Sequence, residues 1–167
     1  MSTPNTSSTP TSTPAPAFIH PDAGERLGIV GDVARILVDG VATGGQTCVF
    51  EGTTAPGLGP PMHSHANEDE YFYIVRGTVK FSINGEIRIA TPGTFVFAPR
   101  GSVHTFVNAG KEPSVMVIWV TPSGLENAFR ENAALFKQNP HASPVELGAI
   151  FKRAGVEFVG PPLSPEL

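Results

Sequence analysis

The sequence predicts an all-β fold, a sandwich or barrel, followed by short C-terminal helices. From about Glu25 onward, short apolar runs alternate with turn residues, as in QTCVFEG, YFYIVRG and TFVFAPRG. Strands at this regular spacing are typical of sandwiches and barrels. An Asn84-Gly85 pair between two alternating runs indicates a hairpin. After Pro122 the apolar residues change to helical spacing, which indicates helices at the end of the chain.

Length and composition fit one globular domain. The chain has 167 residues, of which 40% are hydrophobic and 16% charged. Residues 1–21 are rich in Ser, Thr and Pro and offer no apolar run, so we expect a disordered tail there and a single domain over 22–167. The tail lacks the positive segment and the apolar core of a secretion signal, which favours a cytoplasmic protein.

The composition also argues against two kinds of partner. The net charge is −4 and the sequence has no basic cluster. It therefore lacks the positive patch that a nucleic-acid-binding protein uses to bind phosphates. No segment approaches the roughly 18 consecutive apolar residues of a membrane span. We therefore expect a small-molecule substrate, no nucleic acid and no membrane.

The predicted strands differ in whether one or both of their faces should be buried. In TVKFSINGEIRIA, Val79, Phe81 and Ile83 alternate with polar residues, and Asn84-Gly85 suits a type I′ turn, so one face of this hairpin should be wet. The runs YFYIV and VMVIWV are apolar on both faces. Such strands need cover from the barrel interior on one side and from a helix or a second subunit on the other. This pattern predicts a homodimer.

Two helices are predicted after the strands. The first runs from about Gly124 to Gln138, because Leu125, Ala128, Phe129 and Phe136 can share one helical face. A second should begin at Pro144, with Ser143 as its N-cap and Gly155 ending it. We expect both to form a lid on the barrel or to brace a dimer, and the final VEFVGPPL to be an extended tail.

An unusual group of imidazoles and acids lies in GLGPPMHSHANEDEYFYIVRG, which begins at Gly57. On a strand, His63 and His65 point to the same face, as two ligands of one ion require. Strict alternation would add Asp69 as the carboxylate ligand, whereas a bulge or bend would bring Glu70 instead. His104, in PRGSVHTF, lies on a later strand that a closed barrel can bring alongside. These residues predict a metal site.

Two motifs at fixed spacing carry a resemblance to a known family. The first motif contains Gly57, His63, His65, Glu70 and Gly77. The second contains Gly93, Pro99, Gly101, His104 and Asn108. Both resemble the two motifs of the cupin superfamily. The resemblance implies an antiparallel jelly-roll barrel over about residues 26–121, with a C-terminal helical extension over 122–167. It also implies one divalent transition metal (Fe, Mn, Ni, Co, Cu or Zn) held by His63, His65, Glu70 and His104.

Four stretches recur together over nearly the whole chain after the tail: GLGPPMHSHANEDEYFYIVRG, FVFAPRGSVHTFVN, VTPSGLE and VGPPL. Within the superfamily they resemble the single-domain quercetin 2,3-dioxygenase-like proteins. This resemblance implies an oxygenase that cleaves a flavonol or another enolisable aromatic with dioxygen, with Glu70 as the base that takes the substrate's proton. Phe72 and Phe106 lie two residues beyond proposed ligands and should face the barrel interior, where they can line a substrate cavity. Two alternatives stay open, a metal-dependent isomerase or lyase and a non-enzymatic small-molecule-binding protein.

Overall fold

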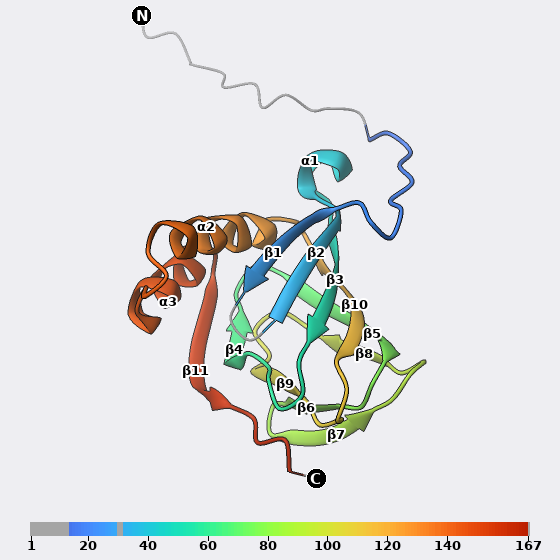
Figure 1. Cartoon of the computed structure of the whole chain (residues 1–167), viewed down its shortest axis with the longest axis vertical. Coiled ribbons are helices and arrows are strands. Elements are labelled where there is room, and N and C mark those ends of the chain that lie inside the picture. Colours follow the sequence, from blue (N-terminus) through green and yellow to red (C-terminus); the bar gives the residue numbers. More distant parts are fainter. Residues whose placement is uncertain (1–13, 30–31, 167) are drawn as a thin grey trace, which may run out of the picture.

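The computed structural model describes residues 14–29 and 32–166, which form a jelly-roll barrel with helices at one side (Figure 1). Residues 1–13 of the predicted tail lie outside the described residues. Residues 14–21, the rest of that tail, are exposed and contain no helix or strand. The predicted fold class, all-β with short C-terminal helices, is confirmed.

Two antiparallel sheets face each other. The six-stranded sheet has the order β1 (Glu25–Ile29), β2 (Asp32–Val38), β3 (Cys48–Thr54), β10 (Ser114–Thr121), β5 (Asp69–Arg76) and β8 (Phe95–Ala98). The five-stranded sheet has the order β11 (Val156–Pro162), β4 (Pro61–His65), β9 (His104–Asn108), β6 (Val79–Ile83) and β7 (Glu86–Ala90). Neighbours in each sheet are mostly distant in sequence, as expected for a jelly roll.

The core lies between the inward faces of these sheets. Its largest fully buried side chains include Phe72 and Ile74 from β5, Phe81 from β6 and Met116 from β10. Along β10 every second residue is buried, so that strand alternates between a core face and an outer face. On the facing strand β4 a similar alternation buries His63 and His65.

The predicted β6–β7 hairpin is confirmed. Asn84 and Gly85 join the two strands with φ of 49° and 82°, the left-handed values that a type I′ turn requires. Phe81 on β6 is buried, whereas Ile87 and Ile89 on β7 are about half exposed. The wet face of this hairpin therefore carries apolar residues as well as Lys80.

Both predicted helices are present, as α2 (Leu125–Gln138) and α3 (Pro144–Arg153), in addition to the short α1 (Gly40–Thr43). Ser143 caps α3 in a capping box with Glu146, which satisfies two backbone N–H groups at that end. In Figure 1, α2 and α3 lie beside β1 and β11. Within the described part of the chain, no helix has the length and apolar character needed to span a membrane.

The last segment differs from the expected extended tail. Residues Val156–Pro162 form strand β11, which pairs with β4 in the five-stranded sheet. The α2–α3 pair reverses the chain and returns it to the barrel, where β11 provides backbone partners for the edge of β4. Only a few alternating residues precede Gly160-Pro161-Pro162, so the strand pattern in the sequence is short.

The two helices leave the outer face of β5, β8 and β10 uncovered. Tyr71 lies there between the rings of Phe97 and Trp119, with centroid distances of 4.9 and 5.3 Å. Phe95 and Phe97 on β8 are about half exposed. The apolar outer faces inferred from the sequence therefore exist, and their cover by a second subunit stays a prediction.

Candidate metal centre

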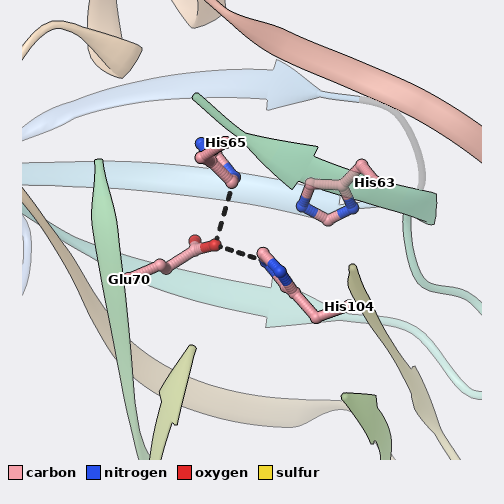
Figure 2. Close-up of side chains that lie close together, drawn as sticks. All are labelled: His63, His65, Glu70 and His104. Atoms are coloured by element: carbon pink, nitrogen blue, oxygen red, sulfur yellow. Dashed lines mark hydrogen bonds and ion pairs between the residues drawn. The ribbon is translucent and has the colours of Figure 1, made fainter. Parts of the chain in front are cut away.

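Four side chains converge inside the barrel from three strands (Figure 2). His63 and His65 come from β4, Glu70 from β5, and His104 from β9, where it lies opposite His63 in the register. One possible ligand atom from each of the four lies within 4.8 Å of the others, and all four residues are buried. The structure thus brings together the ligand set that the cupin resemblance implies.

The imidazoles are oriented toward one another by contacts at their outer nitrogens. Nδ1 of His63 lies 2.8 Å from the carbonyl oxygen of Pro61, and Nδ1 of His104 lies 3.1 Å from that of Ser102. A neutral ring that donates from Nδ1 leaves Nε2 as an acceptor or metal ligand. With Nδ1 directed to a carbonyl oxygen, Nε2 is the nitrogen of each ring that is available to a metal.

Glu70 lies between two of these rings. Its Oε2 is 2.9 Å from Nε2 of His104 and 3.3 Å from Nε2 of His65, as the dashed lines in Figure 2 show. Both ring nitrogens of His65 lie within ion-pair distance of a carboxylate oxygen but make no hydrogen bond, although the ring is almost fully buried. An unsatisfied buried polar group is costly, and coordination of a cation would satisfy this one. Three imidazoles and one carboxylate are suitable donors for a divalent transition metal.

The charges of this cluster are strongly coupled. Burial and the neighbouring His104 lower the pKa of His63 to about 3. Burial alone would lower the pKa of His65, but Glu70 and Glu68 outweigh it and raise that pKa to about 9. Burial alone would raise the pKa of Glu70, but His65 and His104 hold it well below its usual range. Without metal, the cluster thus contains an ion pair between Glu70 and His65.

The structure gives different positions to Asp69 and Glu70, the two carboxylates between which strand alternation could not choose. Asp69 points away from the cluster, where its carboxylate accepts hydrogen bonds from the backbone and guanidinium of Arg100 at 2.9 to 3.1 Å. Glu70 points inward. Residues 66–68 leave the strand between β4 and β5, so the alternation that begins at His63 does not continue through to Asp69.

Glu68 belongs to the surroundings of the cluster, and sequence reasoning gave it no role. It is 4% exposed, and its Oε2 lies 3.4 Å from Nδ1 of His65. A carboxylate at the outer nitrogen of a ligand histidine fixes the ring and its tautomer. The spacing His-x-x-Glu was visible in the sequence, but only the turn after β4 brings the two side chains together.

A cavity opens beside the cluster, and its walls are mostly apolar. Phe50, Ile118 and Phe106 line it from the barrel, while the other end of the wall comes from α2, α3 and β11, with Leu125, Phe129, Phe151, Val156 and Phe158. The cavity volume is about 70 Å³, below the roughly 300–1,000 Å³ of sites for drug-sized ligands. The small volume of the cavity therefore favours a compact ligand.

The two phenylalanines expected at the cavity have different places. Phe106 lines the cavity wall. Phe72 is 1% exposed and packs in the core against Phe81 and Phe106, with its ring 6.2 Å from that of His104. Contact of Phe106 with substrate stays a prediction, whereas Phe72 lies behind the cluster and outside the cavity lining.

Fold and site together define a jelly-roll barrel with a buried three-histidine, one-glutamate cluster. Residues 50–121 match the Cupin domain family. Among solved structures, the chain is similar in fold to KdgF from Halomonas sp., with a TM-score of 0.61 and 18% identity over 68% of this chain and 99% of that one. It is also similar to the polyketide cyclase RemF from Streptomyces resistomycificus, with a TM-score of 0.58 and 19% identity over 65% and 81%. The chain thus has the fold of these structures, and its residues 50–121 resemble a cupin domain.

The curated relatives match about half of this chain. The probable oxidoreductase virH of Hypocrea virens is 32% identical over 76 residues, which cover 44% of this chain and 35% of that protein. Mannose-1-phosphate guanylyltransferase ManC of Salmonella typhimurium is 31% identical over 45% of this chain and 16% of its own length. The tetracenomycin polyketide synthase protein TcmJ of Streptomyces glaucescens is 28% identical over 56% and 63%. The chain spans about a third or less of the first two relatives.

Proposed function

We propose that this protein is a metal-dependent oxygenase that cleaves a compact, enolisable aromatic compound with dioxygen. The observation that carries the proposal is the position of the His63, His65, Glu70 and His104 cluster at the wall of an apolar cavity. A divalent transition metal bound there would supply Lewis acidity toward a substrate oxygen and redox chemistry with dioxygen. The subtype of cupin and the substrate are part of the proposal.

The residues of the chain supply the remaining requirements. Glu70 is the base that accepts the proton of the substrate's enol at Oε2, the atom that lies between His65 and His104. The rings of Phe129, Phe151 and Phe158 form one packed series along the cavity wall, with centroid distances of 6.1 and 5.6 Å. This series excludes water from one side of the reacting molecule and offers flat apolar surfaces to an aromatic ring.

Two substrate classes follow from the chemistry, and the cavity favours the smaller. A flavonol would consume one dioxygen, open its central ring to an ester and release carbon monoxide. An arylpyruvate, which enolises as readily, would consume one dioxygen and give an aromatic aldehyde and oxalate. A cavity of about 70 Å³ favours the single ring of an arylpyruvate over the three rings of a flavonol.

The test begins with the metal content of the full chain purified without added metal. Oxygen uptake is then measured with phenylpyruvate and with 3-hydroxyflavone, alongside the variants His104→Ala and Glu112→Gln. The proposal expects a redox-active metal near one per chain and substrate-dependent oxygen uptake, lost in His104→Ala and kept in Glu112→Gln, because Glu112 is exposed and remote from the cluster.

The other outcomes point to the two alternative functions. Product formation without oxygen would replace the oxygenase with an isomerase or lyase. Recovery of an unchanged ligand that nevertheless perturbs the metal's spectrum would indicate a binding protein. A protein that retains no transition metal under any loading condition would overturn every version of the proposal.

A further inference from the structure

The cavity holds one ionisable side chain besides the metal cluster. Among the described residues that line it, Asp32 is the sole charged group outside His63, His65 and Glu70. Asp32 is the first residue of β2 and faces the same side as the buried Ala34 and Ile36. A carboxylate on an otherwise apolar wall costs free energy unless something compensates for its burial.

The fold holds this carboxylate in one position. Oδ2 accepts a hydrogen bond from the Thr54 hydroxyl at 2.9 Å, and Oδ1 accepts one from the Val33 backbone N–H at 2.7 Å. Gly52 on β3 makes room for it, because a Cβ atom at that position would lie 3.3 Å from Oδ2 of Asp32. A side chain fixed by a buried threonine and accommodated by a glycine is pre-organised for binding.

Asp32 has no cationic partner in the part of the chain that the structure describes. The nearby Arg35 is bound by Glu51 instead, with Nη2 and Oε2 3.0 Å apart. Burial raises the pKa of Asp32 to about 6, against the effect of hydrogen bonds from Thr54, Val33 and Thr53. A carboxylate has about four acceptor positions. Its three internal donors therefore leave capacity for one more.

Asp32 and the metal cluster lie at different ends of the cavity. On β10, Glu70 is level with Val120, whereas Gly52, beside Asp32, is level with Met116, four residues further along that strand. The wall between the two ends is apolar and includes Phe50 and Ile118. A ligand in this cavity thus meets a metal-binding end, an apolar middle and a carboxylate.

We propose that Asp32 binds a hydroxyl group of the substrate, at the end opposite the oxygen that meets the metal cluster. The inference rests on the proposed function for the metal-binding end and adds the second anchor point. A neutral hydroxyl suits the apolar wall better than an ammonium group, whose burial would be costly. A para-hydroxylated single-ring enol matches this layout.

If Asp32 binds a substrate hydroxyl, the protein should bind ligands that carry this hydroxyl more tightly than ligands that lack it. A site with a buried acceptor discriminates against an analogue that lacks the matching donor, because the acceptor is then left unpaired. Phenylpyruvate and 4-hydroxyphenylpyruvate differ by only one para hydroxyl and share the enolisable end. The ratio of the two affinities therefore measures the contribution of Asp32. Changes at the metal-binding end affect both compounds equally and do not alter the ratio.

The experiment measures the dissociation constants of both compounds by calorimetry, with the full chain in excess zinc so that no turnover occurs. We expect wild type to bind 4-hydroxyphenylpyruvate about tenfold more tightly than phenylpyruvate. Asp32→Ala should bring this ratio to about one while leaving the affinity for phenylpyruvate nearly unchanged. Asp32→Asn keeps the shape of the side chain and should lower the ratio, and Asp22→Ala, an exposed carboxylate outside the cavity, should leave it at the wild-type value.

The outcomes separate this inference from the proposed function. Equal affinities in wild type, a preference that survives Asp32→Ala, or no binding of either compound would each overturn the role of Asp32. A tenfold preference that depends on Asp32, together with no oxygen uptake, would support the anchor and overturn the oxygenase. The phenylpyruvate affinity of each variant shows whether the variant is folded.

Discussion

Phe158 on β11 lies directly opposite His63 on β4, with the two rings 6.0 Å apart. The strand that carries two of the four cluster residues is therefore held in place by the C-terminal strand of the chain. Phe158 also contacts Phe151 of α3 and lines the cavity. One side chain thus connects the helices, the cavity wall and the cluster of His63, His65, Glu70 and His104.

This connection predicts that Phe158→Ala weakens both stability and metal binding. Truncation of a half-buried phenylalanine should lower the free energy of unfolding by about 2 kcal/mol, somewhat less than for a fully buried ring. It should also loosen β4 and weaken zinc binding at the cluster. Denaturant unfolding and a zinc titration measure the two effects.

The neighbouring Val159→Ala is the matched control for that variant. Val159 lies on the same strand and is 49% exposed, so its truncation should change stability by no more than about 0.5 kcal/mol. If Phe158→Ala behaved like Val159→Ala, β11 would have no role in shaping the cluster.

Glu68 should act on the metal through His65. With Oε2 of Glu68 3.4 Å from Nδ1 of His65, the carboxylate fixes the ring so that Nε2 points to the cluster. Loss of such an outer partner commonly weakens metal binding about 10- to 100-fold. We expect Glu68→Gln to be at the lower end of this range and Glu68→Ala at the upper end, as measured by competition with a chelator of known zinc affinity.

An unchanged zinc affinity in both variants would contradict the predicted role of Glu68. Glu112→Gln, an exposed glutamate remote from the cluster, is the control for the loss of one negative charge. Retention of the wild-type fold is checked by the thermal midpoint of the metal-free proteins.

Local signals account for the parts of the molecule that were predicted from sequence. Asn84-Gly85 and Ser143-Pro144 specify a turn and a helix start through their own backbone and side-chain preferences, and both are found. The set of four cluster residues followed from the resemblance to the two cupin motifs. Alternation alone could not choose between Asp69 and Glu70, because that choice depends on the irregular residues 66–68 between two strands.

The parts that were not predicted depend on contacts between distant segments. β11 pairs with residues about ninety positions earlier, and its own pattern is cut short by Gly160 and two prolines. Asp32 gave no sequence signal, since its place in the cavity results from the curvature of the barrel and from the space above Gly52. Sequence periodicity shows on which face of a strand or helix a residue lies. The segments that this face contacts depend on the tertiary structure.

The raised pKa of His65 predicts how the stability of the metal-free protein depends on pH. In the folded chain this pKa is about 9, against an ordinary value of 6.5. Protonated His65 pairs with Glu70, so its stabilising effect is complete below about pH 6.5 and is lost as the pH rises through about 9. The thermal midpoint of the metal-free protein should therefore fall between pH 7 and 9.5, and His65→Gln should show a smaller fall.

Metal should reverse this trend, because a cation and a proton compete for the same nitrogen of His65. Below about pH 9 each bound cation must displace that proton, so metal affinity and the resulting stabilisation should grow with pH. Thermal midpoints measured with and without zinc should diverge from pH 7 to 9. A metal-free midpoint that is constant over this range, with a constant zinc effect, would mean that His65 is already neutral at pH 7 and that Glu70 is not paired with it.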